Sequence, residues 1–594
     1  MRSGIGATAV LVIAGSILTS RVASASLAPS PGGARAGGAA DGSAAAGTGG
    51  SGAAGGPAGG AMVSGPVGGA GGGTWSAPQP LRPAPGLDSA SSDIGTLSCG
   101  SPGNCAAGGS VTDAGGVPQA VVADEVDGRW QAPRVVPGTA ALNTGGYAEV
   151  TAVSCWSPGN CAAGGDYLVP VAFSRSSTRA FVVTEVNGTW GTAQPVPGIA
   201  PSPLGSVVTS VSCTADGTCV AGGNDDATGA SRGFVTTEGS GPWSTAYDIP
   251  GLGGLVQVSC GATGSCGAIS GDQVATSMGG SWGSAGHLAL GDGLSASGEV
   301  SYESISCPGA GDCAVGGRYG AAHANDAVVA DERRGSWGPV TVLGGLASQG
   351  GPAAIESVSC SGPGDCAAGG GYVTHGKGLA FVATETAGTW GSPSVVAGLP
   401  LEAGVDPRVS AVSCPPGPGG DCAYAGEWGS QLPAATTSGV FLGDESDGTP
   451  GPAQIVAGGT AGSLRALSCP APGLCAAGGQ GGPAPGAAFV LREATPTTTS
   501  LAIVGGLAAP APGGAAAAKT ARASVMVTSG NGGIPDGQVQ LVEGSTAICA
   551  ITLTGGAGQC LLSAAVLRPG ATLLARYLGS GEFFGSTSPR LVIG

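Results

Sequence analysis

The most reactive side chains in this 594-residue chain belong to eighteen cysteines, which occur in sequence-local pairs. Seven pairs have the spacing Cys-x5-Cys. Zinc sites usually need a shorter Cys-x2–4-Cys spacing or histidine ligands, and the whole chain holds three histidines. We therefore predict disulfides, with no metal and no other cofactor. The predicted bridges are Cys99–Cys105, Cys155–Cys161, Cys213–Cys219, Cys260–Cys266, Cys307–Cys313, Cys360–Cys366, Cys414–Cys422, Cys469–Cys475 and Cys549–Cys560.

One stretch, Gly279–Gly283, matches the Gly-x-Ser-x-Gly pattern of a serine nucleophile. A similar tryptophan-containing stretch returns at Gly335–Gly338, and neither has a strand–turn–helix context or an evident histidine partner. Glutamates also recur once per repeat, which indicates a structural or solvated strand end and not a catalytic pair. They are Glu125, Glu185, Glu238, Glu332, Glu385 and Glu445. We predict no catalytic residue.

The stretches after each Ala-Gly-Gly differ between repeats and collect polar and aromatic side chains. Binding surfaces are often built from variable loops on a constant framework, although simple loop drift gives the same pattern. Arginine, tyrosine and carboxylate side chains together could line a sugar site. A glycosidase would need two carboxylates facing each other across a cleft, which sequence spacing cannot show. The candidate binding residues are Asp166, Tyr167, Asp225, Asp226, Arg318, Tyr319, His323, Tyr372, His375, Glu427 and Trp428.

Two kinds of hairpin alternate along the chain and would position these residues. The first holds the cysteine pair, as in Ser154–Gly165, with a Pro-Gly-Asn turn. The second joins an apolar strand to a tryptophan strand through an Asn-Gly or Asp-Gly turn, as in Ala180–Gly191. The tryptophan recurs at Trp75, Trp130, Trp190, Trp243, Trp282, Trp337 and Trp390, and Pro450 takes its place in the eighth copy.

The period of these hairpins predicts a β-propeller. Successive first cysteines lie 56, 58, 47, 47, 53, 54 and 55 residues apart. Four strands repeated at such a period are typical of a propeller blade. The chain begins with a tryptophan unit at Trp75 and ends with a cysteine unit at Cys469, so the first half-unit could complete the last one and close a ring. We favour eight blades within residues 74–494 over seven blades plus an irregular unit; an open solenoid is a further alternative.

Residues 1–25 have the features of a secretory signal peptide: Arg2, the apolar run Ile5–Leu18, and a cleavage site at Ala23-Ser24-Ala25. The apolar run is short for a membrane anchor. Residues 26–73 are almost wholly glycine, alanine, serine and proline, which predicts a disordered linker. We expect an extracellular protein, secreted or associated with the cell surface, with no membrane span after signal cleavage.

The amino-acid composition limits the fold classes and the kinds of partner that fit this chain. Glycine accounts for 119 residues and only 10% of residues are charged, which favours turn-rich β structure over charge-driven disorder. The formal net charge is −16, and the chain has only two lysines, Lys377 and Lys519. Such a surface repels phosphate backbones, so we expect no nucleic-acid partner.

Residues 495–594 resemble the repeat-type bacterial Ig-like domains of exported proteins. The matching residues are Pro535-Asp-Gly537, Val539, Leu541, Glu543-Gly544, Leu553, Gln559–Leu561, Leu567, Pro569-Gly570 and the segment Ala575–Ser588. The resemblance implies spacing, display or adhesion without catalytic residues, with Cys549 and Cys560 facing each other across a hairpin. Residues 74–494 are similar to secreted bacterial β-propeller repeat proteins with paired cysteines in each blade, which implies a fold and not an activity.

Taken together, the sequence predicts an all-β, exported, monomeric protein in which a β-propeller precedes an Ig-like β-sandwich. The expected role is non-enzymatic binding or adhesion to an extracellular protein or polysaccharide through one propeller face. Two alternatives stay open: a glycan-active hydrolase or lyase on the same scaffold, and a structural spacer.

Overall fold

The structure is a computed structural model. It describes residues 74–593 except 172–174, 203, 227–228, 230, 240, 322–323, 347–350, 401–404, 418–420, 430–437, 447, 457–461, 482–486, 505–520, 530–532 and 564. The predicted signal peptide and linker lie outside these residues. Nearly all regular structure in the described part is β-strand, beside the short helix α1 (Thr139–Leu142). None of the helical structure described there is long and apolar enough to cross a bilayer.

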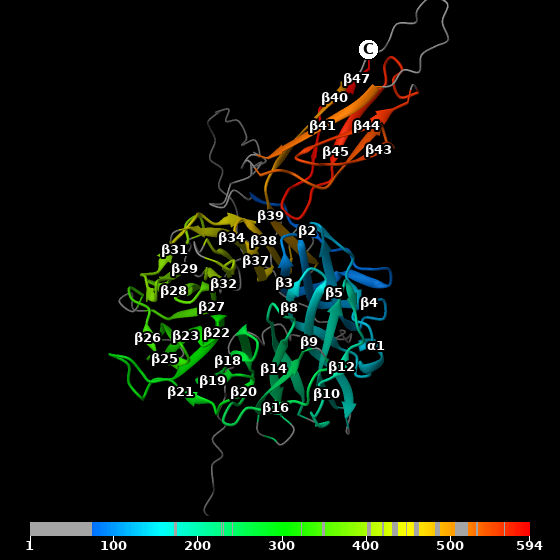
Figure 1. The fold of residues 1–594 in the computed structure, drawn as a ribbon. Helices are drawn as coiled ribbons and strands as arrows, with labels where there is room; N and C mark the ends of the chain where they lie inside the picture. Colours follow the sequence, from blue (N-terminus) through cyan, green and yellow to red (C-terminus); the bar gives the residue numbers. More distant parts are fainter. Residues whose placement is uncertain are drawn as a thin grey trace, which may run out of the picture. The chain divides into compact units, whose positions relative to one another are not determined.

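Eight antiparallel sheets follow one another in the described part of 74–494, and Figure 1 shows them around a common centre. The first contains β3 (Leu87–Ser101), β4 (Asn104–Asp113), β5 (Pro118–Val126), β6 (Arg129–Trp130) and β7 (Arg134–Val135). The second contains β8 (Ala148–Ser157), β9 (Asn160–Val171), β10 (Arg175–Val186), β11 (Thr189–Trp190) and β12 (Gln194–Pro195). The third contains β13 (Ser206–Cys213), β14 (Cys219–Asp225), β15 (Arg232–Glu238) and β16 (Tyr247–Asp248). The fourth contains β17 (Gln257–Ala262), β18 (Ser265–Ser270), β19 (Gln273–Met278), β20 (Ser281–Trp282) and β21 (Gly286–His287).

The remaining four sheets repeat this order. The fifth contains β22 (Val300–Gly309), β23 (Asp312–Ala321), β24 (Ala324–Arg333), β25 (Ser336–Trp337) and β26 (Thr341–Val342). The sixth contains β27 (Ala353–Gly362), β28 (Asp365–Thr374), β29 (Lys377–Thr386), β30 (Thr389–Trp390) and β31 (Ser394–Val395). The seventh contains β32 (Arg408–Ser413), β33 (Ala423–Trp428), β34 (Gly439–Ser446), β35 (Thr449–Pro450) and β36 (Gln454–Ile455). The eighth combines β37 (Ser463–Ala471), β38 (Leu474–Gln480) and β39 (Ala488–Ala494) with β1 (Thr74–Trp75) and β2 (Gln79–Pro80).

The two ends of this region meet in the eighth sheet. Thr74 pairs with Ala494 and Trp75 with Glu493, so the N-terminal strand supplies the tryptophan strand that the last cysteine unit lacks. In Figure 1 the blue β2 accordingly lies beside β39. The order of units in the sequence predicted this pairing.

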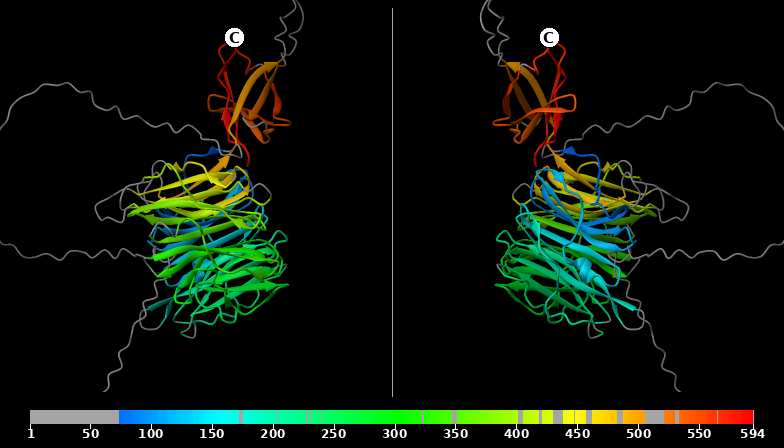
Figure 2. Two further views of the ribbon diagram at one scale, coloured as in Figure 1. Left: turned by 90° about the vertical axis from the view of Figure 1, so that its left-hand side faces the viewer. Right: turned by 90° about the vertical axis from the view of Figure 1, so that its right-hand side faces the viewer.

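The first strands of the sheets lie innermost. We call them the inner strands: β3, β8, β13, β17, β22, β27, β32 and β37. Each contacts the next, and β37 contacts β3, so the contacts form a closed cycle. Figure 2 shows the same sheets from two opposite sides, each view turned by 90° from that of Figure 1.

Each cysteine hairpin is pinned by a disulfide, and in five of the eight sheets the two cysteines are directly paired across the strands. Cys155 pairs with Cys161, their Cα atoms are 4.0 Å apart, and Gly159 takes a positive φ of 66° in the turn. The returning strand must carry small residues, because at Gly164 the next sheet packs against it and at Gly165 the neighbouring strand β8 of its own sheet lies close. A Cβ on Gly164 would lie 2.4 Å from Val208 Cγ1, and one on Gly165 would lie 2.0 Å from the carbonyl oxygen of Glu149.

All nine predicted disulfides are confirmed. Eight of them close hairpins between the first and second strands of a sheet. The ninth differs from the expectation, because Cys549 and Cys560 lie on successive strands that belong to different sheets. It therefore crosslinks two sheets and does not pin one hairpin.

The C-terminal part has two antiparallel sheets. One contains β40 (Thr497–Val504), β41 (Ala521–Ser529) and β44 (Ala557–Leu562). The other contains β42 (Gln538–Glu543), β43 (Thr546–Thr552), β45 (Thr572–Tyr577), β46 (Ser586–Thr587) and β47 (Leu591–Val592). Residues from both sheets, including Val525, Leu541 and Leu573, share one buried core.

Candidate binding site on the inner strands

Most of the predicted binding residues lie on strands and not in loops. Asp166 and Tyr167 lie on β9, Asp225 on β14, Arg318 and Tyr319 on β23, Tyr372 on β28, and Glu427 and Trp428 on β33. In the six sheets whose second strand has a Gly-Gly pair, this strand continues past the pair because its pairing with the third strand continues, as between Tyr167 and Arg179. Asp226 follows β14 and His375 follows β28, while His323 lies outside the described residues.

Several of these side chains are part of the core between sheets. Asp166, Tyr167, Asp225, Glu427 and Trp428 are buried. Trp428 stacks on Phe441 with ring centroids 6.3 Å apart, and Tyr167 and Tyr372 contact the matching phenylalanines of their own sheets. Of the remaining described candidates, Asp226, Arg318, Tyr319 and Tyr372 are partly exposed and His375 is exposed.

Two of the predicted residues, Arg318 and Glu427, belong to a cluster of charged side chains on the inner strands and their neighbours. Four ion pairs define it: Arg318–Glu303 at 3.0 Å, Arg408–Glu427 at 2.9 Å, Arg465–Glu427 at 3.1 Å and Arg408–Glu356 at 3.7 Å. We call these six residues the inner-strand cluster. They come from β22, β23, β27, β32, β33 and β37, which belong to sheets five to eight.

The electrostatics tie these ion pairs into one network. Burial raises the pKa of Glu356, Arg408 opposes that rise, and the carboxylate of Glu427 adds to it. The charges of Arg465 and Glu303 have smaller effects on the pKa of Glu356, in the lowering and raising directions respectively. Burial likewise raises the pKa of Asp93 on β3, where Arg465 opposes the rise. A residue of the first sheet therefore adjoins the cluster.

The cluster exposes its cations more than its anions. Exposed side-chain fractions are 30%, 38% and 40% for Arg318, Arg408 and Arg465, against 20%, 27% and 10% for Glu303, Glu356 and Glu427. Each guanidinium has five N–H donors in a planar fork, more than its ion pairs use. The cluster can therefore offer N–H donors to an acidic group while its carboxylates accept hydroxyl hydrogens.

Sequence reasoning missed Glu303, Glu356, Arg408 and Arg465 because they precede the cysteine unit. Seven of the described inner strands carry a register shift four residues before their first cysteine. The residues at these bulges are Gly95, Thr151, Thr209, Glu303, Glu356, Ser410 and Arg465. A bulge often re-aims a side chain beside a functional site. At this position the charged residues Glu303, Glu356 and Arg465 replace the small residues of the other repeats, and this change is the sequence feature that could have indicated the cluster.

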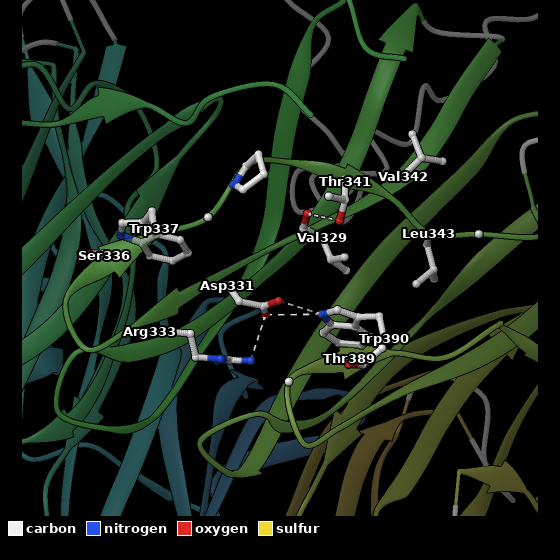
Figure 3. Close-up of a pocket in the computed structure, with 14 residues that line it drawn as sticks. Val329, Asp331, Arg333, Ser336, Trp337, Thr341, Val342, Leu343, Thr389 and Trp390 are labelled. Atoms are coloured by element: carbon white, nitrogen blue, oxygen red, sulfur yellow. Dashed lines mark hydrogen bonds and ion pairs between the residues drawn. The ribbon is translucent and has the colours of Figure 1, made fainter. Parts of the chain in front are cut away.

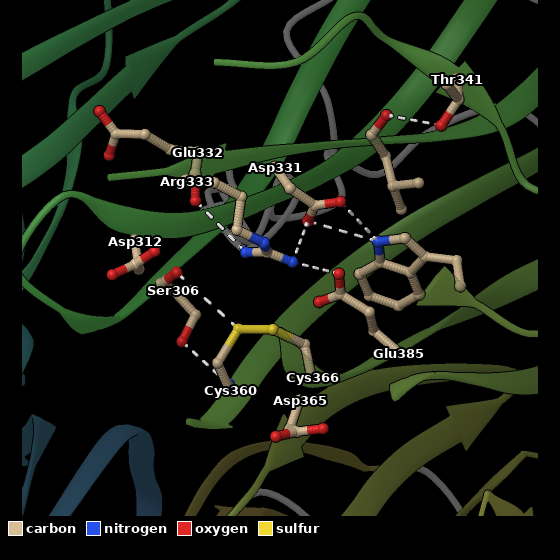
Figure 4. A network of polar contacts seen from close by, with 12 residues as sticks. Ser306, Asp312, Asp331, Glu332, Arg333, Thr341, Cys360, Asp365, Cys366 and Glu385 are labelled. Atoms are coloured by element: carbon tan, nitrogen blue, oxygen red, sulfur yellow. Dashed lines mark hydrogen bonds and ion pairs between the residues drawn. A yellow bond between two sulfur atoms is a disulfide. The ribbon is translucent and has the colours of Figure 1, made fainter. Parts of the chain in front are cut away.

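Five of the six glutamates that recur once per repeat are buried, and the sixth, Glu238, is partly exposed. Glu185 pairs with Cys161 on one side and with Trp190 on the other. Burial raises the pKa of Glu125, Glu185 and Glu385 to about 7. Figure 4 shows Glu385 beside the guanidinium of Arg333, with which it forms an ion pair. Of the two roles predicted for these residues, the structural one agrees with this burial.

A search against protein-family models found no match, and a search of curated proteins found none. Among solved structures, a Dyadobacter fermentans protein of unknown function is 10% identical, with 71% of this chain and 99% of that chain covered and a TM-score of 0.34. An ulvan lyase of a polysaccharide lyase family is also 10% identical, with coverages of 69% and 94% and a TM-score of 0.37. A prolyl endopeptidase is 12% identical, with coverages of 73% and 54% and a TM-score of 0.32.

Proposed function

We propose that the eight sheets are the blades of a β-propeller and that residues 495–594 form an Ig-like β-sandwich. The pairing of Thr74 with Ala494 and the closed cycle of inner-strand contacts support the first assignment. Two antiparallel sheets around one core support the second. Nine disulfides favour an oxidising, extracellular environment, as expected for an exported chain.

The function that this geometry supports best is non-catalytic binding of an extracellular polysaccharide that carries uronic-acid carboxylates. The observation that carries the proposal is the inner-strand cluster, where three partly exposed arginines converge from neighbouring sheets. Arginine binds carboxylates through paired N–H donors. The neighbouring Glu303 and Glu356 can accept hydrogen bonds from sugar hydroxyls, so a polymer with both groups suits the cluster better than a simple anion.

A second candidate is a hydrolase or lyase acting on the same class of polysaccharide. The raised pKa of Glu356, with Glu303 and Glu427 nearby, is the observation that favours it, because a carboxyl that holds its proton can act as a general acid. Binding remains the preferred function because the carboxylates of the cluster are engaged in ion pairs with arginine.

Titration of the purified protein with an oligogalacturonate tests the proposal. The variant that carries Arg318→Gln and Arg465→Gln should bind at least about tenfold more weakly, because charge-assisted hydrogen bonds contribute about 1.5–3 kcal/mol. Arg134→Gln is the matched control: its arginine is 44% exposed and also forms an ion pair, with Asp124 at 2.6 Å. Unchanged affinity in the double variant would refute the assignment, and release of shorter oligosaccharides would favour the enzyme.

A further inference from the structure

A cavity of about 600 Å³ lies between the outer strands of the fifth and sixth sheets. Figure 3 shows Asp331 and Arg333 between the indoles of Trp337 and Trp390. Val329, Val342 and Leu343 supply the apolar part of its wall, and Ser336, Thr341 and Thr389 are polar lining residues. The volume is in the range that holds a small organic ligand. None of these residues belongs to the inner-strand cluster.

Both indoles are held by their nitrogen atoms. Trp337 Nε1 donates a 3.1 Å hydrogen bond to Thr276 Oγ1 of the fourth sheet. Trp390 Nε1 donates to both carboxylate oxygens of Asp331, at 3.2 and 3.3 Å. These hydrogen bonds fix the positions of the indoles. They also satisfy both indole N–H groups, so a ligand that covers the rings need not supply an acceptor for them.

The charges in the cavity are fixed too. Arg333 forms an ion pair with the buried Glu385 and lies 3.9 Å from Asp331. The side chains of Arg333 and Asp331 keep exposed fractions of 35% and 21%. One cation and one anion therefore face the cavity together, which favours a neutral ligand with hydroxyl groups over a charged one.

Arg333 is peculiar to this cavity among the repeats. Arg333 directly follows the recurrent glutamate of its repeat, a position that Ser277 takes in the fourth repeat. In the eight repeats the residue after this position is, in chain order, Val126, Val186, Gly239, Met278, Arg333, Thr386, Ser446 and Ala494. The first sheet is the natural comparison, because Asp124 there also accepts from the next tryptophan, Trp190, at 2.9 Å. It has Val126 in place of the arginine.

We propose that this cavity binds a neutral pyranose unit of a glycan, at a site separate from the inner-strand cluster. A pyranose ring has an apolar face that can cover an indole and a rim of hydroxyls that can donate to Asp331 and accept from Arg333. The cavity wall presents the same division, with indole and aliphatic carbons beside one ion pair and three hydroxyl-bearing lining residues. An aromatic side chain of a peptide would cover the exposed parts of Asp331 and Arg333 and offer them no hydrogen bond in exchange for water.

The test uses the full chain labelled with 5-fluorotryptophan and observed by fluorine NMR, with Trp337 and Trp390 assigned by Trp→Phe variants. The probes are methyl α-glucopyranoside, methyl α-mannopyranoside, methyl α-galactopyranoside and N-acetylglucosamine. We expect at least one probe to shift both signals saturably, with a dissociation constant on the order of 1 mM, as befits a ligand of about a dozen heavy atoms.

Two variants locate the effect. Thr389→Tyr adds a ring at an exposed position in the cavity, and Thr189→Tyr adds the same ring at the equivalent exposed position of the second sheet. The shifts should disappear in the first variant and persist in the second, while oligogalacturonate binding is unchanged in both. The proposal is overturned if no pyranoside shifts either signal, if the shifts survive Thr389→Tyr, or if an aromatic peptide shifts the signals and the sugars do not.

Discussion

The backbone N–H of Cys99 donates a 3.0 Å hydrogen bond to Ser468 Oγ, across 369 residues of sequence. An equivalent bond joins every pair of neighbouring sheets. In each sheet a serine directly precedes the first cysteine, and its Oγ accepts from the backbone N–H of the first cysteine in the next sheet. The seven other donor–acceptor pairs are Cys155–Ser98, Cys213–Ser154, Cys260–Ser212, Cys307–Ser259, Cys360–Ser306, Cys414–Ser359 and Cys469–Ser413, all at 2.9–3.0 Å. The Cys99–Ser468 bond completes the cycle.

Substitution Ser468→Ala should lower the free energy of unfolding by about 1 kcal/mol, because it leaves the partly buried N–H of Cys99 without its acceptor. Denaturant unfolding monitored by tryptophan fluorescence measures the loss. Ser154→Ala removes the equivalent bond to Cys213 within the chain and should have a similar effect. A loss at Ser154 without one at Ser468 would mean that the ring is open between the eighth and first sheets.

Removal of β1 and β2 should be far more damaging than removal of the segment before them. A chain that begins at Arg82 loses the buried Trp75 and its pairing with Glu493, for which we expect at least about 3 kcal/mol of destabilisation. A chain that begins at Thr74 should unfold like the full-length protein. Equal stability of the two truncated chains, measured by urea titration, would contradict closure by the N-terminal strand.

The double substitution Cys155→Ser with Cys161→Ser should lower the free energy of unfolding by about 2 kcal/mol, the loop-entropy value for a seven-residue loop. The hairpin itself should persist, because its strands remain paired on both sides of the bridge. Calorimetry of the variant and the parent in parallel measures the change. A protein that fails to fold without this one bridge would show that the bridges do more than pin local hairpins.

Stability should fall as the pH rises from about 4.5 to about 7. The folded-state pKa values of Glu125, Glu185 and Glu385 are about 7, above the ordinary 4.5, so the folded state holds protons that the unfolded state has lost. Their stabilising contribution is full below pH 4.5 and disappears above about 7. Glu185→Gln should flatten the profile, and the exposed Glu299→Gln should leave it unchanged. A profile for the parent that rises over this window would be incompatible with protonated buried glutamates.

Arg492 should be needed to hold the C-terminal part against the eighth sheet. Its guanidinium donates to the carbonyl oxygens of Ser580 at 2.9 Å and Phe583 at 3.2 Å, and lies 4.8 Å from the ring centroid of Phe584. Arg492→Ala should split one calorimetric transition into two, whereas Arg576→Ala, at an exposed position, should not. A single unchanged transition in Arg492→Ala would argue against this role.

The repeat pattern predicted much of the fold because its signals are local. The close spacing of the cysteine pairs, Cys-x5-Cys in seven of them, predicted each pinned hairpin, and the position of Trp75 before the first cysteine unit predicted its pairing with the last sheet. The ninth bridge joins the predicted cysteines, but it was expected to cross one hairpin, because nothing in the spacing of Cys549 and Cys560 shows that consecutive strands join different sheets.

The binding residues were harder to predict, because burial depends on partners that are distant in sequence. Tyr167 and Trp428 have the side chains of a binding surface, yet each packs on a phenylalanine of its own sheet. Arg408 and Arg465 gave no periodic signal, since charge occurs in only some repeats at those positions. The partnership of Arg333 with Glu385 likewise spans two sheets and 52 residues.

The most direct measurement of the proposed function compares an oligogalacturonate with its carboxyl-reduced counterpart on the unmodified protein. Because Arg318, Arg408 and Arg465 would bind the carboxylates, isothermal titration should show saturable binding of the acidic oligosaccharide and at least about tenfold weaker binding of the reduced one. Equal affinity for the two, or binding of neither, would contradict recognition of uronic-acid polysaccharides by the inner-strand cluster.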